Sequence, residues 1–319
     1  MFRLYDEAEK IRILGIEVYR FGFFVMLGLI LAAAMIGFLC WARRTRKGTG
    51  PLLLLLSLVL GGICSRLFFC LMSFEDLGSM LPLPAWFDIT GGGWSMMGLV
   101  GGVMLAAWAA ALLTRQKAGL LLDIAACALP LFMVLERVGE GCIPQFDFSR
   151  KLDTDLLNNT FLTFSDYDGH YLATWKLTAI VMGILVPILI WDLTRSRKDG
   201  DTCLLFLLLF GGCSVILESL RYDHFLTVHS FVGMEHVAAA ILLAVGVFIP
   251  AGRAHKRKKS LAAAAVISVF LMVILAVLLE FALDRTEFNK LVIYAAYLVI
   301  VAVPVVLGLR LRRTGDRPL

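Results

Sequence analysis

Nine apolar stretches of about 20 residues constrain the fold of this chain more than any other feature. They lie near residues 17–41, 51–73, 93–113, 120–137, 171–193, 202–221, 232–250, 260–281 and 291–309. A helix of this length crosses the hydrocarbon core of a bilayer. With 60% hydrophobic and 17% charged residues among 319, the composition is too apolar for a soluble domain. The sequence therefore predicts an all-α fold, a polytopic membrane helix bundle with nine spans.

The basic residues gather in alternate connections between these spans. Four follow the first span, two the third, three the fifth and five the seventh, and four lie in the C-terminal tail, which makes 18 of the 30. The connection 74–92 has none. Because cytoplasmic loops carry the excess of Lys and Arg, we expect the N-terminus outside and the C-terminus in the cytoplasm. The net charge of +5 then reflects orientation, and we expect no nucleic acid partner.

The spans differ in character along the chain. Residues 1–250 hold seven spans and an outside arm at about 143–170, rich in Asp, Asn, Thr and aromatic residues. Residues 251–319 hold two plainly apolar spans and a basic cytoplasmic tail. The seven cysteines lack the paired spacing of a metal site or a disulfide framework, so we expect no metal.

Six glycines lie in the stretch 90–102, inside a strongly apolar region. Glycine is about 1 kcal/mol less favourable than alanine in a helix interior, so its presence here needs a reason. Close packing of another helix is one reason, through the spacing of Gly98 and Gly102, and it is the commoner one in membranes. Close approach of a ligand headgroup to the backbone is the other.

Charged residues of the spans fall mostly in the outer halves. They are Arg66, Arg137, Glu140, Lys176, Glu218, Arg221, Glu235 and His236, whereas Asp123 and Asp192 lie near inner ends. An Arg at the centre of a span raises the insertion free energy by about 2.5 to 3.5 kcal/mol, so it should face protein and an anionic partner. Glu218 and Arg221, three residues apart on a helix, are placed to form an ion pair.

The general polarity of span ends explains Glu235 or His236 taken singly. Arg66, Arg137 and Arg221 together indicate something more specific, because several cations beside glycine backbone suit a phosphate headgroup. We therefore expect guanidinium groups from separate helices to converge near the outer leaflet, and a lipid as substrate.

These motifs, in this order over the first 250 residues, resemble the bacterial prolipoprotein diacylglyceryl transferases, which are inner-membrane enzymes with seven spans. The resemblance rests on Leu14-Gly15 to Phe21-Gly22, Gly61-Gly62 with Arg66, Gly98 with Gly101-Gly102, Leu122-Asp123 with Arg137 and Gly139, and Glu218 with Arg221. It implies transfer of a diacylglyceryl group from phosphatidylglycerol to the lipobox cysteine thiol of a secreted precursor. Glycerol phosphate is released, and no cofactor is implied.

Residue roles follow from these matched positions. Arg137 is the expected phosphate clamp, Arg66 and Arg221 assist it, and Glu218 orients a guanidinium. Glu140 is a candidate general base. Further contacts to substrate are expected from Ser95, Met97, Gly98, Gly101, Gly102 and Gly139.

Several positions depart from the family pattern, and the family's Phe-x-Asn-Gly-Glu run is replaced by Gly141 to Gln145. The chain has Phe21 for a tyrosine, Met97 for a histidine, Glu140 for an asparagine, Lys176 for a glutamate and Ser214 for an arginine. If the histidine is the general base, Met97 cannot replace it, and Glu140 or His224 would have to. The charge lost at Ser214 and gained at Lys176 suggests a relocated cation.

Two alternatives to catalysis stay open from the sequence. One is a protein of the same shape that binds an anionic phospholipid or a lipoprotein without catalysis, as the changes at Met97 and Ser214 suggest. The other is a transporter, which the absence of an inverted repeat disfavours.

Overall fold

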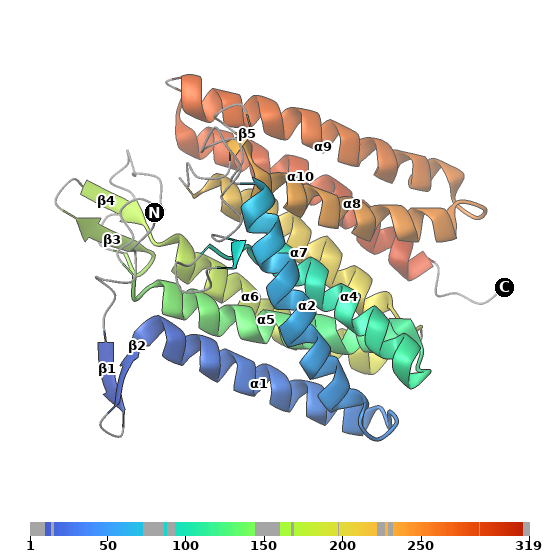
Figure 1. The fold of residues 1–319 in the computed structure, drawn as a ribbon. Coiled ribbons are helices and arrows are strands. Elements are labelled where there is room, and N and C mark those ends of the chain that lie inside the picture. Colours follow the sequence, from blue (N-terminus) through green and yellow to red (C-terminus); the bar gives the residue numbers. More distant parts are fainter. Residues whose placement is uncertain are drawn as a thin grey trace.

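The computed structural model describes residues 10–13, 16–72, 86–87, 93–143, 160–166, 169–196, 198–221, 227–228, 232–286 and 288–314. Within these ranges nine helices are long and apolar enough to cross a membrane, which confirms the predicted bundle. They are α1 (Arg20–Ala42), α2 (Thr49–Met72), α4 (Met96–Thr114), α5 (Ala118–Glu140), α6 (Thr174–Arg195), α7 (Asp201–Ser219), α8 (Met234–Ala254), α9 (Lys259–Arg285) and α10 (Lys290–Thr314) (Figure 1).

Three short antiparallel hairpins precede α1, α6 and α8. They are β1 (Lys10–Ile13) with β2 (Ile16–Tyr19), β3 (Thr163–Asp166) with β4 (Gly169–Leu172), and β5 (Thr227–Val228) with β6 (Val232–Gly233). The spans predicted to begin at 17, 171 and 232 therefore begin two or three residues later, because β-branched and aromatic residues there pair as strands. Of the predicted outside arm, β3 and β4 are described, whereas residues 144–159 lie outside the described residues.

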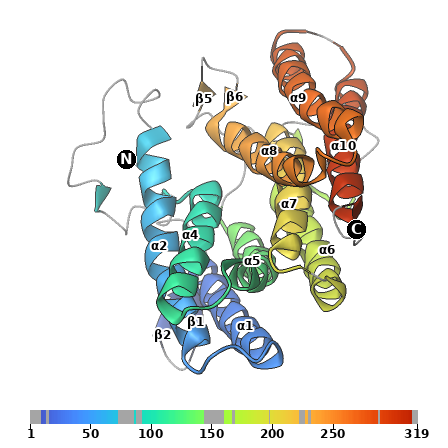
Figure 2. The ribbon, with the colours of Figure 1, turned by 90° about the vertical axis from the view of Figure 1, so that its right-hand side faces the viewer.

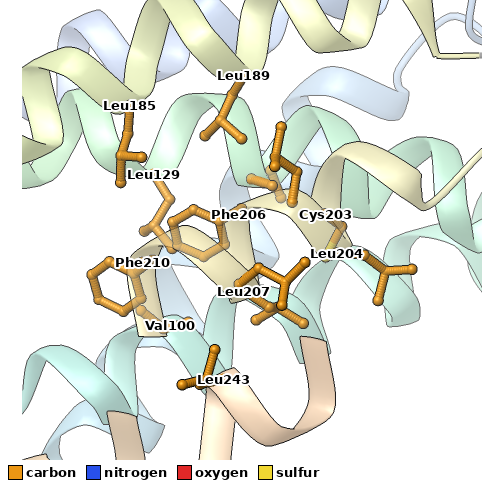
Figure 3. Close-up of a cluster of buried hydrophobic side chains, with 14 of the residues drawn as sticks. Val100, Leu129, Leu185, Leu189, Cys203, Leu204, Phe206, Leu207, Phe210 and Leu243 are labelled. Atoms are coloured by element: carbon orange, nitrogen blue, oxygen red, sulfur yellow. The ribbon is translucent and has the colours of Figure 1, made fainter. Parts of the chain in front are cut away.

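The two helices α5 and α7 lie at the centre of the bundle. α5 packs on α1, α4, α6 and α7, and α7 packs on α8 and α10 as well. Figure 2 shows α2 paired with α4 on one side, and α9 with α10 on the other. Among the nine described helices α7 is the most buried, since 78% of its most apolar 18-residue stretch is buried. In Figure 3 its Phe206 and Phe210 lie among leucines of α5, α6 and α8, as expected for a helix that is apolar on every face.

Asp123 joins the two central helices at the end where α7 begins. Its carboxylate, on α5, accepts from the backbone N–H groups of Gly200 at 2.8 Å and Cys203 at 2.7 Å. A helix leaves its first N–H groups unpaired, and they carry the positive end of the helix dipole. The Asp123 carboxylate, from the neighbouring helix α5, accepts from two of these N–H groups and is negatively charged. Asp123 thus has a structural part in fixing α7 beside α5.

The glycines of α4 pack that helix against α2. A Cβ atom added at Gly98 would lie 2.6 Å from the carbonyl oxygen of Cys64, and one at Gly102 would lie 2.4 Å from that of Leu60. At Gly101 the same atom would have nothing within 4 Å. Of the two uses that the sequence left open, the structure gives Gly98 and Gly102 the packing use.

Gly139 also serves packing, against α1. A Cβ atom there would lie 3.0 Å from Cβ of Phe24. The contacts of the structure therefore account for Gly98, Gly102 and Gly139 through neighbouring helices, without a substrate. The sequence did not show which helix each glycine faces.

Helices α9 and α10 attach to the rest of the bundle through buried polar contacts. Tyr297 of α10 donates to Glu280 of α9 at 2.9 Å, and Glu280 lies 3.7 Å from His236 of α8. All three side chains are buried. Tyr294 of α10 donates to the backbone carbonyl of Ser219 at 3.1 Å, where α7 ends.

The other end of α10 is attached as well. Arg312 donates to both carboxylate oxygens of Asp192 on α6, and to the backbone carbonyl of Asp201 at 2.9 Å. Asp192 also accepts from Thr202 at 3.0 Å. Helix α10 is therefore hydrogen-bonded to α7 near both of its ends, and to α6 at its C-terminal end.

The Tyr297→Phe variant should be less stable than the wild type. It removes only the buried hydroxyl and leaves Glu280 without one donor, which lowers the free energy of unfolding by about 1–3 kcal/mol. Thermal unfolding in detergent measures this loss as a fall of the melting temperature by several degrees. Tyr19→Phe is the control, because Tyr19 is 39% exposed. Equal melting of the two variants would contradict a role of the Glu280 contacts in attaching α10.

Candidate active site

Six charged side chains gather at the end of the bundle where α5 and α7 finish and α8 begins. They form the Arg137 cluster, defined as Glu136, Arg137, Glu140, Glu218, Arg221 and Glu235. Four carboxylates thus surround two guanidinium groups among the described residues. Charges at such depth are stabilised by pairing with opposite charges.

Glu140 links the two guanidinium groups. One of its oxygens accepts from Nη1 of Arg137, and the other accepts from Nη2 of Arg221 at 3.0 Å. Because Arg137 lies on α5 and Arg221 follows α7, this carboxylate joins the ends of the two central helices. From the sequence we expected the two arginines to converge, and in the structure both donate to Glu140.

Two further carboxylates hold the same guanidinium groups. Nε of Arg137 lies 3.3 Å from Oε2 of Glu136, and Nε of Arg221 lies 3.9 Å from Oε2 of Glu218. The ion pair expected between Glu218 and Arg221 is therefore confirmed. Arg137 is only 8% exposed, so its charge is neutralised almost entirely by protein. Its place in the last turn of α5 is also favourable, since a helix C-terminus attracts cations.

Glu235 approaches the cluster from the first turn of α8. Its Oε2 accepts from the backbone N–H of Met97 at 3.3 Å, and its carboxylate is hydrogen-bonded to the Ser95 hydroxyl. Ser95 is the N-cap of α4, where its oxygen accepts from the N–H of Gly98 at 3.0 Å. Glu235 also interacts electrostatically with Arg137 and Arg221. The general polarity of a span end was therefore an insufficient explanation of this residue.

Arg66 has different surroundings from the other two arginines. Its guanidinium donates to the carbonyl oxygens of Gly93 at 2.7 Å and Trp86 at 3.3 Å. It also faces the rings of Phe69 at 5.6 Å and Trp94 at 5.9 Å. These contacts fix the segment that leads into α4. Of the three guanidinium groups expected to converge, the structure brings two onto one carboxylate and uses Arg66 to hold backbone.

A pocket opens beside Arg137 between α4, α5, α6 and α7. Its lining includes Met97, Met133, Arg137, Ser214 and Glu218. Ser214 is buried and small, so it leaves room next to the guanidinium. Met97 belongs to both parts of the site, since its side chain lines the pocket and its N–H donates to Glu235.

The sequence profile of the family described as prolipoprotein diacylglyceryl transferase matches residues 9–251. The chain belongs to this family. A comparison with curated proteins finds no match. The matched residues run from β1 into the last turns of α8, so they contain the whole Arg137 cluster, whereas α9 and α10 follow them. The members of this family are transferases, with lipid and lipoprotein precursor substrates, and the chain is a multi-pass membrane protein.

Met97 and Ser214 are two further departures from the family pattern that lie at this site, besides Glu140. Met97 is buried at the start of α4, and Ser214 lines the pocket. Lys176, in contrast, donates to the carbonyl oxygen of Phe161 at 3.0 Å and lies over the ring of Trp175 at 5.1 Å. It holds the segment before β3, and the suggested relocation of a cation from position 214 to position 176 stays a prediction. His224 lies outside the described residues.

Proposed function

We propose that the chain transfers a diacylglyceryl group from phosphatidylglycerol, or a similar anionic phospholipid, to the cysteine thiol of a lipoprotein precursor. The family supplies the reaction class, and the Arg137 cluster supports the lipid donor. The observation that carries this proposal is that Arg137 and Arg221, from separate helices, both bind Glu140. Two guanidinium groups on one oxyanion are the arrangement that binds a phosphodiester strongly.

Glu140 keeps the guanidinium groups in place when no lipid is bound. A phosphodiester presents two oxygens in much the same way as a carboxylate does, so it replaces Glu140 between Arg137 and Arg221. Glu218 and Glu136 hold the outer sides of the two arginines and keep their direction. The site is thereby organised before the lipid arrives, which is how charged sites stabilise a leaving group.

The reaction exchanges one bond for another at a glycerol carbon of the lipid. The thiolate sulfur forms a C–S bond to the carbon that carries the phosphate, and the C–O bond to the phosphate breaks. The electron pair leaves with glycerol phosphate, and the thiol proton is released. Arg137 and Arg221 stabilise the charge that develops on the phosphate as it departs.

The cluster lies at the outer leaflet of the bacterial cytoplasmic membrane in this proposal. The basic ends of α1, α4, α6, α8 and α10 lie at the opposite end of the bundle from the cluster. Lys and Arg mark the cytoplasmic side of membrane proteins, so the cluster faces outward, where secreted precursors emerge.

A transfer assay with purified components tests the proposal. Protein in detergent is incubated with phosphatidylglycerol and a peptide that carries a lipobox cysteine, and the peptide mass is measured. We expect a mass gain of one diacylglyceryl group and release of glycerol phosphate. A peptide in which serine replaces the cysteine should gain no mass, because it has no thiol.

A second function has one observation in its favour, since Met97 and Ser214 replace the family's histidine and arginine. In that case the chain binds an anionic lipid or a lipoprotein without catalysis. The same sample distinguishes the two functions, because lipid that copurifies without any thioether product supports binding alone.

A further inference from the structure

Transfer to a thiol requires an acceptor for the thiol proton, since the thiolate is the nucleophile. The family's histidine, an ordinary acceptor, is Met97 in this chain. A methionine thioether does not accept a proton near neutral pH, so another side chain must do so. The inference below rests on the proposed function and names that side chain.

Three of the four carboxylates in the Arg137 cluster are engaged by guanidinium groups. Each oxygen of Glu140 accepts from an arginine, Glu136 pairs with Arg137, and Glu218 pairs with Arg221. A carboxylate whose two oxygens both accept from guanidinium groups, as in Glu140, strongly favours its charged form. Glu140 is therefore a poor acceptor of a thiol proton, whereas Glu136 and Glu218 each lie against one guanidinium group and position it.

Glu235 is held differently. Its hydrogen bonds come from the Ser95 hydroxyl and the Met97 N–H, which are neutral donors. A carboxylate has about four positions that accept hydrogen bonds, so two donors leave some of them open. The charged groups that face Glu235 are Arg137 and Glu136 of α5 and Arg221 beyond α7, whereas α4 contributes the neutral groups.

Glu235 lies beside position 97, where the family has a histidine and this chain has Met97. Its carboxylate contacts the backbone of position 97 itself, and the side chain of Met97 lines the pocket beside Arg137. A group bound to this backbone lies next to the pocket beside Arg137, which is one of the two arginines proposed to hold the phosphate. Ser95 fixes the carboxylate there, because the same hydroxyl caps α4.

We propose that Glu235 is the general base of the transfer, supplied by α8 in place of the histidine of the family. The thiol S–H bond breaks and its proton passes to the Glu235 carboxylate. The sulfur electron pair forms the C–S bond, and the C–O bond electrons leave with the phosphate. The proton then passes from Glu235 to the departing glycerol phosphate or to water, which restores the carboxylate.

The Glu235→Gln variant tests this role. Gln keeps the size of the side chain and an oxygen that accepts from Met97, but it does not take the thiol proton. We expect the transfer rate at pH 7 to fall by about 100-fold, in the usual range for a general base. The rate of the variant should then rise roughly tenfold per pH unit up to pH 8, because only free thiolate reacts. The wild-type rate should change much less over this range.

Two matched variants accompany it. Glu17→Gln makes the same chemical change at an exposed carboxylate of β2. Among the described contacts Glu17 pairs only with Arg12, which is also exposed, so this variant should keep wild-type activity. Glu235→Asp keeps a carboxylate one methylene further away and should retain a flat pH profile at a reduced rate. Thermal unfolding of each variant in detergent shows whether it is folded, so that the transfer rates of folded proteins are compared.

The outcomes separate this inference from the proposed function. If the wild type transfers the group and Glu235→Gln has the same activity and the same pH profile, the role of Glu235 is overturned. The proposed function is left standing. A reduced rate in Glu235→Gln with an unchanged pH profile also overturns the role of Glu235, since that result describes a structural residue. Absence of transfer by the wild type overturns both.

Discussion

The Arg137→Ala variant is expected to transfer diacylglyceryl at least about 1,000-fold more slowly than the wild type. Removal of a single donor to a developing oxyanion lowers kcat by about 10²–10³-fold. Arg137 contributes more than this, because its loss leaves Glu136 and Glu140 buried without their principal cation. Breaking a buried ion pair in this way lowers stability by about 3–5 kcal/mol. The transfer assay with phosphatidylglycerol and the cysteine peptide measures the rate.

Two variants make this result specific. Arg137→Lys keeps the charge but loses the planar fork of donors, so we expect it to fold better than Arg137→Ala and to remain strongly impaired. Lys117→Ala removes a cation at the opposite end of the bundle, where Lys117 is exposed and lies 2.9 Å from Asp199. That variant should transfer at the wild-type rate. Full activity in Arg137→Ala would refute a phosphate clamp at this position.

The Gly102→Leu variant is expected to yield almost no folded protein. Even the first atom of the new side chain would lie 2.4 Å from the carbonyl oxygen of Leu60 and 2.7 Å from Cα of Gly61. Both are backbone atoms, which a rotamer change cannot move. Forcing α4 away from α2 removes the packing on which this helix pair depends. We expect the free energy of unfolding to fall by more than the usual loss of about 1–3 kcal/mol in an overpacked core. Size-exclusion chromatography in detergent measures the yield of monodisperse protein.

Gly101→Leu provides a control within the same helix. A Cβ atom at Gly101 has nothing within 4 Å, and its neighbour in sequence is Gly102. The new side chain therefore extends away from α2 and should be tolerated, with a small gain in helix propensity. If the two variants gave equal yields, the close approach of α4 and α2 would be refuted.

The sequence predicts the spans well, because a bilayer imposes length and hydropathy on each helix separately. The helix ends were less accurate. The fourth span was predicted to stop at 137, whereas α5 continues to Glu140 and so places Arg137 and Glu140 one turn apart. The hairpins before α1, α6 and α8 were missed, since strands of two to four residues carry little pattern.

The candidate site could be predicted only where its contacts are local. The pair of Glu218 and Arg221 follows from their spacing along one helix. Glu235 and Met97 are 138 residues apart, and no periodicity relates them. Arg66 was grouped with Arg137 and Arg221 because all three lie in the outer halves of spans, but depth in a membrane does not fix the direction of a side chain. Arg66 binds the backbone of Gly93 and Trp86 instead.

The attachment of α10 has a consequence for the order in which the protein is assembled. Ribosomes deliver the N-terminal helices first, at about 5–20 residues per second. The contacts of Ser219 with Tyr294 and of Asp192 with Arg312 form only when α10 has entered the bilayer. The end of α7 next to Arg221 therefore reaches its final form only after α10 has been translated, and a nascent chain that stops before α10 is left immature there.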